Sequence, residues 1–139
     1  MISCFNSYAD GLMDLLSPEA TQALLKAGRR ITLNDGQLFQ SRGSDEVGMV
    51  VILKGSVRLM TLGKDGTALL TAILGQGQQF NEITLFAHVH RTHDVMGIGN
   101  TELLVLNSDQ FNAVVQTYPE VIKALLISNT QRMHQLVET

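Results

Sequence analysis

The fold is decided by residues 47–78, VGMVVILKGSVRLMTLGKDGTALLTAILGQGQ, in which short apolar runs alternate with glycine-containing turns. Within this stretch, Asp65-Gly66 is a typical tip of a β-hairpin. The same rhythm extends outward over residues 29–107, in runs such as ITL, QLFQ, DVMGIG and TELLVL. Turn signals at such close spacing are typical of a barrel or sandwich of antiparallel strands. We expect DVMGIG and TELLVL to form its last strand pair.

Helix signals precede this β region. Ser17 is a favourable N-cap, Pro18 is a favourable first helical residue, and Gly28 is a natural helix stop. The residues between them carry a modest apolar stripe, so the helix needs a larger surface to pack on. Residues 1–28 are therefore expected to form a helical support for the β region.

Two further helices are expected over residues 108–139, the first capped by Asn107 or Ser108 and the second starting at Tyr118-Pro119. In the second helix, residues recur at steps of four and three, the spacing of a coiled-coil seam. The seam consists of Ile122, Leu126, Asn129, Met133 and Leu136. It predicts a homodimer formed through this helix, because one polar seam residue can fix the register of paired helices. Packing of the seam against the chain's own β region is the alternative. The helical periodicity persists to the last residues, which leaves open a longer protein.

The composition sets limits on function. The 139 residues are enough for one domain, and 45% hydrophobic with 17% charged residues is ordinary for a soluble globular protein. Ten basic and thirteen acidic residues give a formal charge of −3 without a basic cluster, so we expect no DNA contact by this segment itself. The N-terminal residues show neither a signal peptide nor a membrane span, and the single Cys4 cannot form an intramolecular disulfide. These features predict a cytoplasmic protein.

The order of a helix, many short strands and two helices resembles the sensor domain of the Crp/Fnr family, which has the cyclic-nucleotide-binding fold. The resemblance rests on Gly36, Gly55, the run LGQGQQFNEITLF, Arg91 and Pro119-Glu120, and it covers roughly the whole chain. It implies one domain over residues 1–139, mostly β with flanking helices. Its centre would be a double-stranded β-helix (jelly-roll, or β-roll) over residues 29–107. It also implies a ligand-sensing, non-enzymatic part of a transcription regulator.

In that family a phosphate-binding cassette reads Phe-Gly-Glu, a short helical turn, and Arg-Ser/Thr-Ala, and residues 80–95 are similar to it. The corresponding positions are Phe80-Asn81-Glu82, the turn from Ile83 to Phe86, and Arg91-Thr92-His93. The resemblance implies cAMP or cGMP as the small anionic effector, with Arg91 on the phosphate and Glu82 accepting from the ribose 2′-hydroxyl. Free backbone N–H groups of the turn near Glu82 are expected to add to the anion site. The predicted ligand-binding residues are Asn81, Glu82, Ile83, Arg91, Thr92 and His93. Ligand contact is expected to shift the last helix.

Two positions depart from the cassette of the family. Asn81 replaces a glycine whose backbone takes positive φ, and asparagine is the next most tolerant residue of that conformation. His93 replaces a small alanine. Both departures favour an alternative function, a ligand-free dimerising or partner-binding scaffold of the same fold. For Arg91 alone, the plainer interpretation is a surface arginine paired with Asp94 or another acid.

Three histidines of the same segment, His88, His90 and His93, follow the pattern H-x-H-x-x-H. Imidazole pairs suit zinc, iron or copper, so a cupin-like metal-binding protein is a further alternative. A haem-sensing variant of the Crp/Fnr family also uses an axial histidine in this region. However, the remaining histidine, His134, lies in the last helix, away from any inward-facing strand. We therefore expect no metal site.

Overall fold

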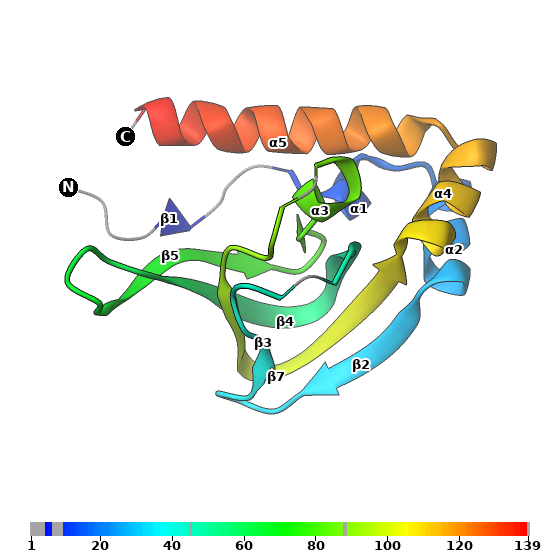
Figure 1. Cartoon of the computed structure of the whole chain (residues 1–139). Helices are drawn as coiled ribbons and strands as arrows, with labels where there is room; N and C mark the ends of the chain where they lie inside the picture. Colours follow the sequence, from blue (N-terminus) through cyan, green and yellow to red (C-terminus); the bar gives the residue numbers. More distant parts are fainter. Residues whose placement is uncertain (1–4, 7–9, 45, 88, 139) are drawn as a thin grey trace.

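The computed structural model describes residues 5–6, 10–44, 46–87 and 89–138, with the side chains of residues 10–135 among these. The strands form one curved and mostly antiparallel sheet that rolls on itself, with the helices along one side of it (Figure 1). This arrangement confirms the predicted β-roll with flanking helices.

The sheet is built around two long strands that pair with each other. The strands are β1 (Phe5–Asn6), β2 (Arg29–Leu33), β3 (Leu38–Gln40), β4 (Gly48–Leu62), β5 (Ala68–Gly75), β6 (Gln79–Phe80) and β7 (Asp94–Asn107). Their order is β1-β5-β4-β7-β2, with β3 on β7 and β6 on β4. The β4–β7 register shifts around Gly55, which has a φ of 84°. A Cβ there would lie 2.6 Å from the Asn100 carbonyl oxygen, so only glycine fits this bend.

The expected last strand pair is wrong. DVMGIG and TELLVL are two halves of the single strand β7, which bends at Gly99 (φ 66°) instead of reversing. Because the antiparallel partner β4 is itself continuous, both halves find their hydrogen bonds on one neighbour. Gly99 and Asn100, which interrupt the strand pattern, therefore mark a bend and not a hairpin.

Helices flank the roll at both ends of the chain. They are α1 (Leu12–Leu15), α2 (Pro18–Ala27), α3 (Ile83–Phe86), α4 (Ser108–Thr117) and α5 (Glu120–Glu138). The caps are those predicted, since Ser17 accepts a hydrogen bond from the Ala20 N–H and Asn107 accepts one from the Gln110 N–H. The predicted helical support over residues 1–28 contains α1 and α2 and also a short strand, because β1 pairs in parallel with β5.

Both faces of β4 are covered, which produces two apolar cores. Val50 and Ile52 point into the roll, where they pack with residues such as Val57. The alternate residues Met49 and Val51 point to the other face and pack under the helices. Each such fully buried side chain contributes about 1.5–3 kcal/mol relative to an exposed one. The core that contains Met49 and Val51 holds the helices against the outer face of the roll.

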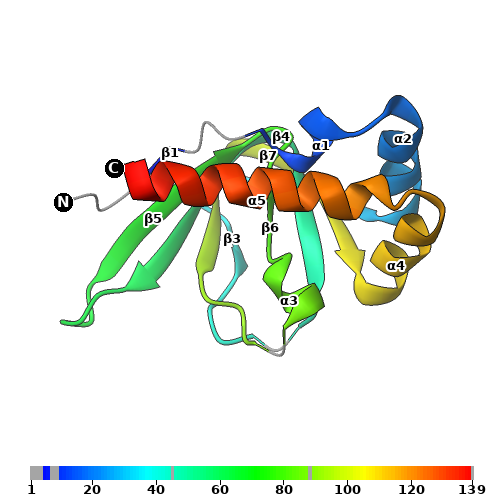
Figure 2. The same ribbon diagram turned by 90° about the horizontal axis from the view of Figure 1, so that it is seen from above.

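Helix α5 lies lengthwise across the molecule, with α3 beside it (Figure 2). Its inner face carries Val121, Leu125 and Ser128, all buried. The seam residues Leu126 and Met133 are each 66% exposed instead, so their packing against the chain's own β region is excluded. The side chain of Leu136 lies outside the described residues. Among the described residues no helix is long and apolar enough to cross a membrane.

Candidate effector site

The cassette-like segment begins at a strained turn that only a few residue types tolerate. Asn81 follows β6 with a φ of 68°, and it is the one non-glycine residue with positive φ in the described part of the chain. This confirms that asparagine replaces the expected glycine in its conformation. Its side chain also forms a reciprocal amide pair with Gln40, with N···O distances of 3.2 and 2.6 Å. The turn is thereby fastened to β3.

The carboxyl group of Glu82 lies beneath α5. Its Oε1 is 3.9 Å from Nη1 of Arg132, and the two side chains are only 13% and 16% exposed. Burial raises the pKa of Glu82 although Arg132 and the Asn129 amide oppose this. Burial likewise lowers the pKa of Arg132. The Oε2 atom of Glu82 accepts no hydrogen bond from the described residues, which leaves a buried acceptor available.

Arg132 was not foreseen as a partner of Glu82. It is the charged member of the inner face of α5, in helical register with Val121, Leu125 and Ser128. That register is the one signal by which the sequence could have revealed it. The coiled-coil interpretation instead drew attention to Asn129, whose amide contacts Glu82 within the same chain.

A buried glutamine joins the start of the cassette to two helices. Gln79, which is fully buried, accepts a hydrogen bond from the Leu12 N–H of α1 at 2.8 Å and donates one to Ser128 Oγ of α5 at 3.0 Å. The backbone oxygen of the same residue lies 3.4 Å from Nη2 of Arg132. The strand that leads to Glu82 is therefore tied directly to α5.

Arg91 occupies the other end of the segment, and it is buried, with 6% exposure of its side chain. Its Nη2 lies 3.6 Å from Oε2 of Glu46, and its Cζ lies 6.0 Å from the centroid of the Phe39 ring. Burial lowers the pKa of Arg91, and Glu46 opposes this. The Nε atom has no hydrogen-bond acceptor among the described residues. Arg91 is thus a buried cation with an incomplete set of partners.

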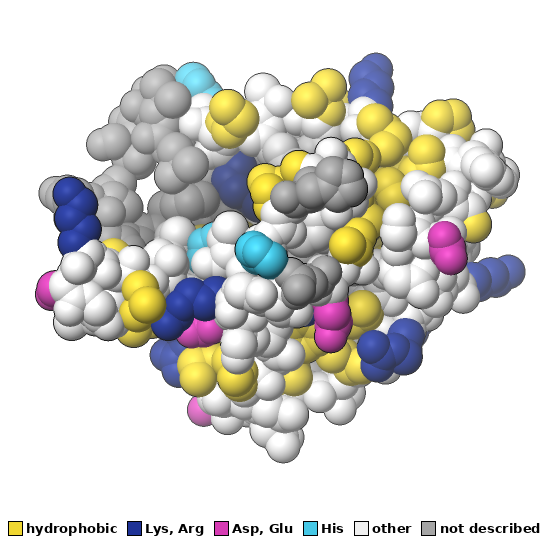
Figure 3. All heavy atoms as spheres, viewed as in Figure 1, with side chains coloured by type: hydrophobic (Ala, Val, Ile, Leu, Met, Phe, Trp, Pro, Cys, Tyr) yellow, Lys and Arg dark blue, Asp and Glu magenta, His cyan; other side chains and the backbone are white. Residues whose placement is uncertain are grey.

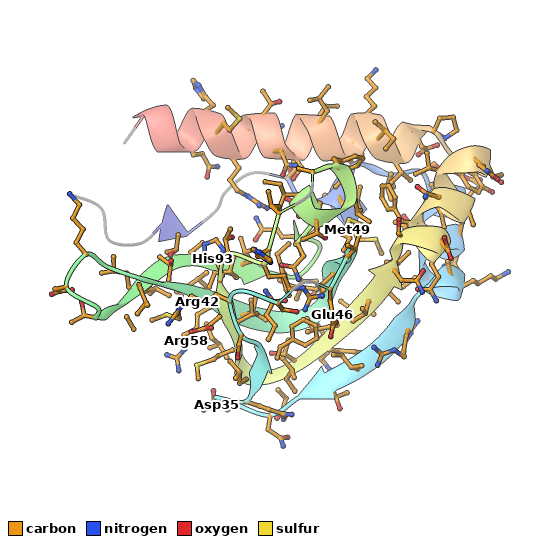
Figure 4. All side chains as sticks on the ribbon, viewed as in Figure 1. Asp35, Arg42, Glu46, Met49, Arg58 and His93 are labelled. Atoms are coloured by element: carbon orange, nitrogen blue, oxygen red, sulfur yellow. The ribbon has the colours of Figure 1, made fainter. Side chains whose placement is uncertain are left out.

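The alternative of a surface arginine paired with Asp94 or another acid is wrong in its exposure and for Asp94, although Arg91 does pair with another acid, Glu46. Asp94 instead accepts two hydrogen bonds from Arg42, from its backbone N–H at 2.8 Å and from Nη1 at 2.6 Å. The loop that carries Arg42 runs along the cassette, since the Gly43 N–H donates to the Arg91 oxygen at 2.6 Å. Arg42 lies near the β3 end of this loop and Glu46 near its β4 end (Figure 4).

An open cleft of about 750 Å³ lies between β2, β3 and the loop residues 41–44 and 46. We call it the β2–β3 cleft. Side chains that line it include Arg29, Ile31, Phe39, Arg42, Glu46 and Arg91. Both basic and acidic side chains are exposed on the face of the molecule seen in Figure 3. A cleft of this size with an apolar floor and a few polar groups is suited to a small ligand.

The other predicted site residues lie outside the lining of this cleft. Thr92 is exposed and its hydroxyl lies 2.8 Å from Nδ1 of His93. His93 is half-buried, and burial lowers its pKa against the influence of Asp94, so its imidazole is neutral at pH 7. Ile83 is exposed on α3. Neither Glu82 nor Asn81 lines the cleft with Arg91.

The turn after Glu82 offers fewer donors than expected. The N–H groups of Thr84 and Leu85 already donate to the carbonyl oxygens of Asn81 and Glu82, each at 3.0 Å. Thr84 also binds Gly48 through its hydroxyl. The expectation of N–H groups free for an anion is therefore wrong for Thr84 and Leu85.

The histidine pattern is only partly visible. His88 lies outside the described residues, and His90 is exposed. In the part of the chain that the structure describes, no group of three or more His, Cys, Asp or Glu residues is placed to hold a metal ion.

Comparisons with known proteins place the chain in a family. The sequence model described as cyclic nucleotide-binding domain matches residues 30–118, more than half of the chain. The chain is 25% identical over 120 residues to the cyclic AMP receptor protein of Thermus thermophilus, covering 86% of this chain and 56% of that protein. It is 26% identical over 108 residues to lysophospholipase NTE1 of Chaetomium globosum, covering 78% of this chain and 7% of that protein. The crystal structure of the Thermus thermophilus catabolite activator protein matches with a TM-score of 0.80 at 25% identity, covering 90% of this chain and 59% of that one.

These matches confirm the resemblance to Crp/Fnr sensor domains. The likeness to the lysophospholipase concerns a small part of that enzyme, so it carries no catalytic activity to this chain. The match over residues 30–118 runs from β2 to α4 and includes the cassette-like segment. The chain belongs to the cyclic nucleotide-binding domain family.

Proposed function

We propose that this chain is a regulatory sensor domain of a transcription regulator, and that it binds a small anionic effector, a cyclic nucleotide, through Arg91. The observation that carries the proposal is the state of Arg91, a buried guanidinium with an unpartnered Nε at the wall of an open cleft. A phosphate would supply several acceptor oxygens to such a group, and charge-assisted bonds of this kind are among the strong ones. The predicted ligand-binding residues Asn81, Glu82, Ile83, Arg91, Thr92 and His93 are part of this proposal.

Glu82 provides the second contact and the route to α5. Its buried Oε2 lacks a hydrogen-bond donor among the described residues, so a ribose hydroxyl would satisfy it. The other carboxyl oxygen faces Arg132 on α5. A ligand that engages Glu82 would weaken its attraction to Arg132 and so alter the position of α5. Because Glu82 does not line the β2–β3 cleft, a ligand that binds both Glu82 and Arg91 must extend beyond that cleft.

We test effector binding by isothermal titration calorimetry with cAMP and with cGMP. The wild-type chain should give saturable heat, and Arg91→Ala should abolish it. Arg30→Ala is the matched control, because this arginine is 58% exposed and pairs with Glu102 away from the cleft. Absence of heat with both nucleotides, or equal heat from the wild type and Arg91→Ala, contradicts the proposal.

A ligand-free scaffold is the second candidate. The observation in its favour is that Glu46 already neutralises Arg91, while Asn81 and Gln40 satisfy each other. In that case the calorimetric titrations give no heat, and the scaffold binds its partner through the exposed apolar residues Ile122, Leu126 and Met133 of α5.

We also propose that two copies of the chain pair through α5. Ile122, Leu126 and Met133 form an exposed apolar stripe on this helix, at the spacing of a coiled-coil seam. Sedimentation should show a dimer for the wild type and a monomer for Leu126→Glu. Ile127→Glu is the matched control, since Ile127 is an exposed apolar residue of α5 outside the stripe. A monomeric wild type, or a dimer that survives Leu126→Glu, contradicts this interface.

A further inference from the structure

The contact between Arg91 and Glu46 joins a buried group to an exposed one. The Arg91 side chain is 6% exposed and that of Glu46 is 79% exposed. Their N···O distance of 3.6 Å is too long for a hydrogen bond, so the pair is held by charge alone. Water competes for the exposed carboxylate, and pairs of this kind are weak. Glu46 is therefore a partner that Arg91 can exchange.

The loop that carries Glu46 is held in place by other contacts. Arg42 binds Asp94 twice, at 2.8 and 2.6 Å. The Arg91 N–H donates to the Ser44 oxygen at 2.9 Å, which adds to the bond from Gly43. The Glu46 side chain can therefore leave Arg91 while the loop stays against the cassette.

The charges around the β2–β3 cleft favour an incoming anion. Among the described residues, its lining contains the three arginines Arg29, Arg42 and Arg91, against one acid, Glu46. Asp94 compensates Arg42 from outside the lining. Once Glu46 swings away, no other described acid pairs with the guanidinium of Arg91, so an incoming anion is favoured there.

We propose that Glu46 is an internal stand-in for the effector: its carboxylate occupies the anion position at Arg91 and is exchanged for the effector's phosphate. This inference rests on the proposed function and adds to it the residue that an effector must displace. A carboxylate and a phosphate compete for the same guanidinium, and the phosphate offers more acceptor oxygens. Glu46 thereby lowers the apparent affinity for every anion and selects ligands that bind Arg91 better than a carboxylate does.

The first test compares nucleotide affinity by calorimetry in the wild type, Glu46→Gln and Glu102→Gln. Glu46→Gln keeps the size of the side chain and removes its charge, so cAMP or cGMP should bind about threefold to tenfold more tightly. Glu102→Gln is the matched control for the change in net charge, because Glu102 lies outside the β2–β3 cleft. Its affinity should stay within about twofold of the wild type. Equal or weaker binding by Glu46→Gln than by the wild type overturns the proposal.

A second test does not depend on the nucleotide. The Nε–H signal of Arg91, assigned with Arg91→Lys, is followed by nuclear magnetic resonance during titration with inorganic phosphate. The signal should shift in both proteins, with half-saturation at a lower phosphate concentration in Glu46→Gln. If the nucleotides give no heat but this difference appears, the effector assignment fails while the exchange at Arg91 stands. If half-saturation is the same in both proteins, or the signal never shifts, the exchange itself is wrong.

Discussion

The two ends of the cassette-like segment hold their charges in different ways. At one end Glu82 faces Arg132, and both side chains are largely buried, with 13% and 16% exposure. At the other end Arg91 is buried, but its partner Glu46 is 79% exposed. Breaking the first pair leaves two charges in a poorly hydrated place, whereas breaking the second leaves only Arg91 there, because Glu46 returns to water. The contact of Glu82 with Arg132 therefore holds the segment to α5, whereas Arg91 can exchange Glu46 for another anion.

The surroundings of the two ends agree with this division. Beside Glu82, the buried Gln79 ties β6 to α1 and α5, so three elements meet at one place. Beside Arg91, the neighbouring space is the open β2–β3 cleft. A ligand that enters at the Arg91 end and reaches Glu82 would connect an exchangeable contact to one that holds α5.

The largest expected effect follows from removing Arg132. Arg132→Met leaves the Glu82 carboxylate buried without its cation, so the free energy of unfolding should fall by about 3 kcal/mol, the lower end for breaking a buried pair. Urea unfolding at pH 7 measures the change. The loss should shrink at acidic pH, where Glu82 is protonated, and in the double variant Glu82→Gln with Arg132→Met.

The matched control for Arg132→Met is Arg30→Met, which breaks the exposed pair of Arg30 with Glu102. That change should cost less than about 1 kcal/mol. If the two substitutions cost the same, the pair under α5 is no more structural than a surface contact, and the difference between the two ends of the segment disappears.

Much of the fold could be predicted from the sequence because its signals are local. The turn at Asp65-Gly66 and the caps Ser17 and Asn107 act over a few neighbouring residues, and each was found where expected. The positive φ of Asn81 was also foreseen, because backbone tolerance is a property of the residue itself. The bend of β7 at Gly99 was missed because one glycine serves equally for a bend and for a turn.

The partners within the site could not be predicted. Glu46 and Arg91 belong to separate parts of the chain, as do Glu82 and Arg132, and nothing in the local pattern of one member points to the other. The cassette motif identified the residues that carry charge. Only the fold decided that Glu82 turns beneath α5 while Arg91 turns to the loop before β4.

The second prediction uses the pH dependence of stability. Burial raises the pKa of Glu82 above its ordinary value of 4.5, so the folded state holds this proton more tightly than the unfolded state. As pH rises from about 4.5 through the raised folded pKa, the wild type should lose stability relative to Glu82→Gln, and the difference should then level off. The loss is about 1.4 kcal/mol for each unit by which the pKa is raised.

Urea unfolding of both proteins at a series of pH values measures this difference. Below the unfolded pKa, Glu82 is protonated in both states and contributes no slope. A wild type that gains stability relative to Glu82→Gln over the same window would mean that Arg132 and Asn129 outweigh burial at this site, and the Glu82 end would be a favourable ion pair.

The smallest effect is expected at the exchangeable end. Glu46→Gln should change the free energy of unfolding by less than about 1 kcal/mol, because the Glu46 side chain is 79% exposed and water screens its charge, so it offsets little of the cost of burying Arg91. Arg42→Met is the internal reference, since it removes the shorter contact that fastens the same loop to Asp94 at 2.6 Å, and it should cost more than Glu46→Gln. Urea unfolding at pH 7 compares the three proteins. A Glu46→Gln variant that unfolds as easily as Arg132→Met would show that the carboxylate is needed to keep Arg91 buried, and the Arg91 end would then be as structural as the end beneath α5.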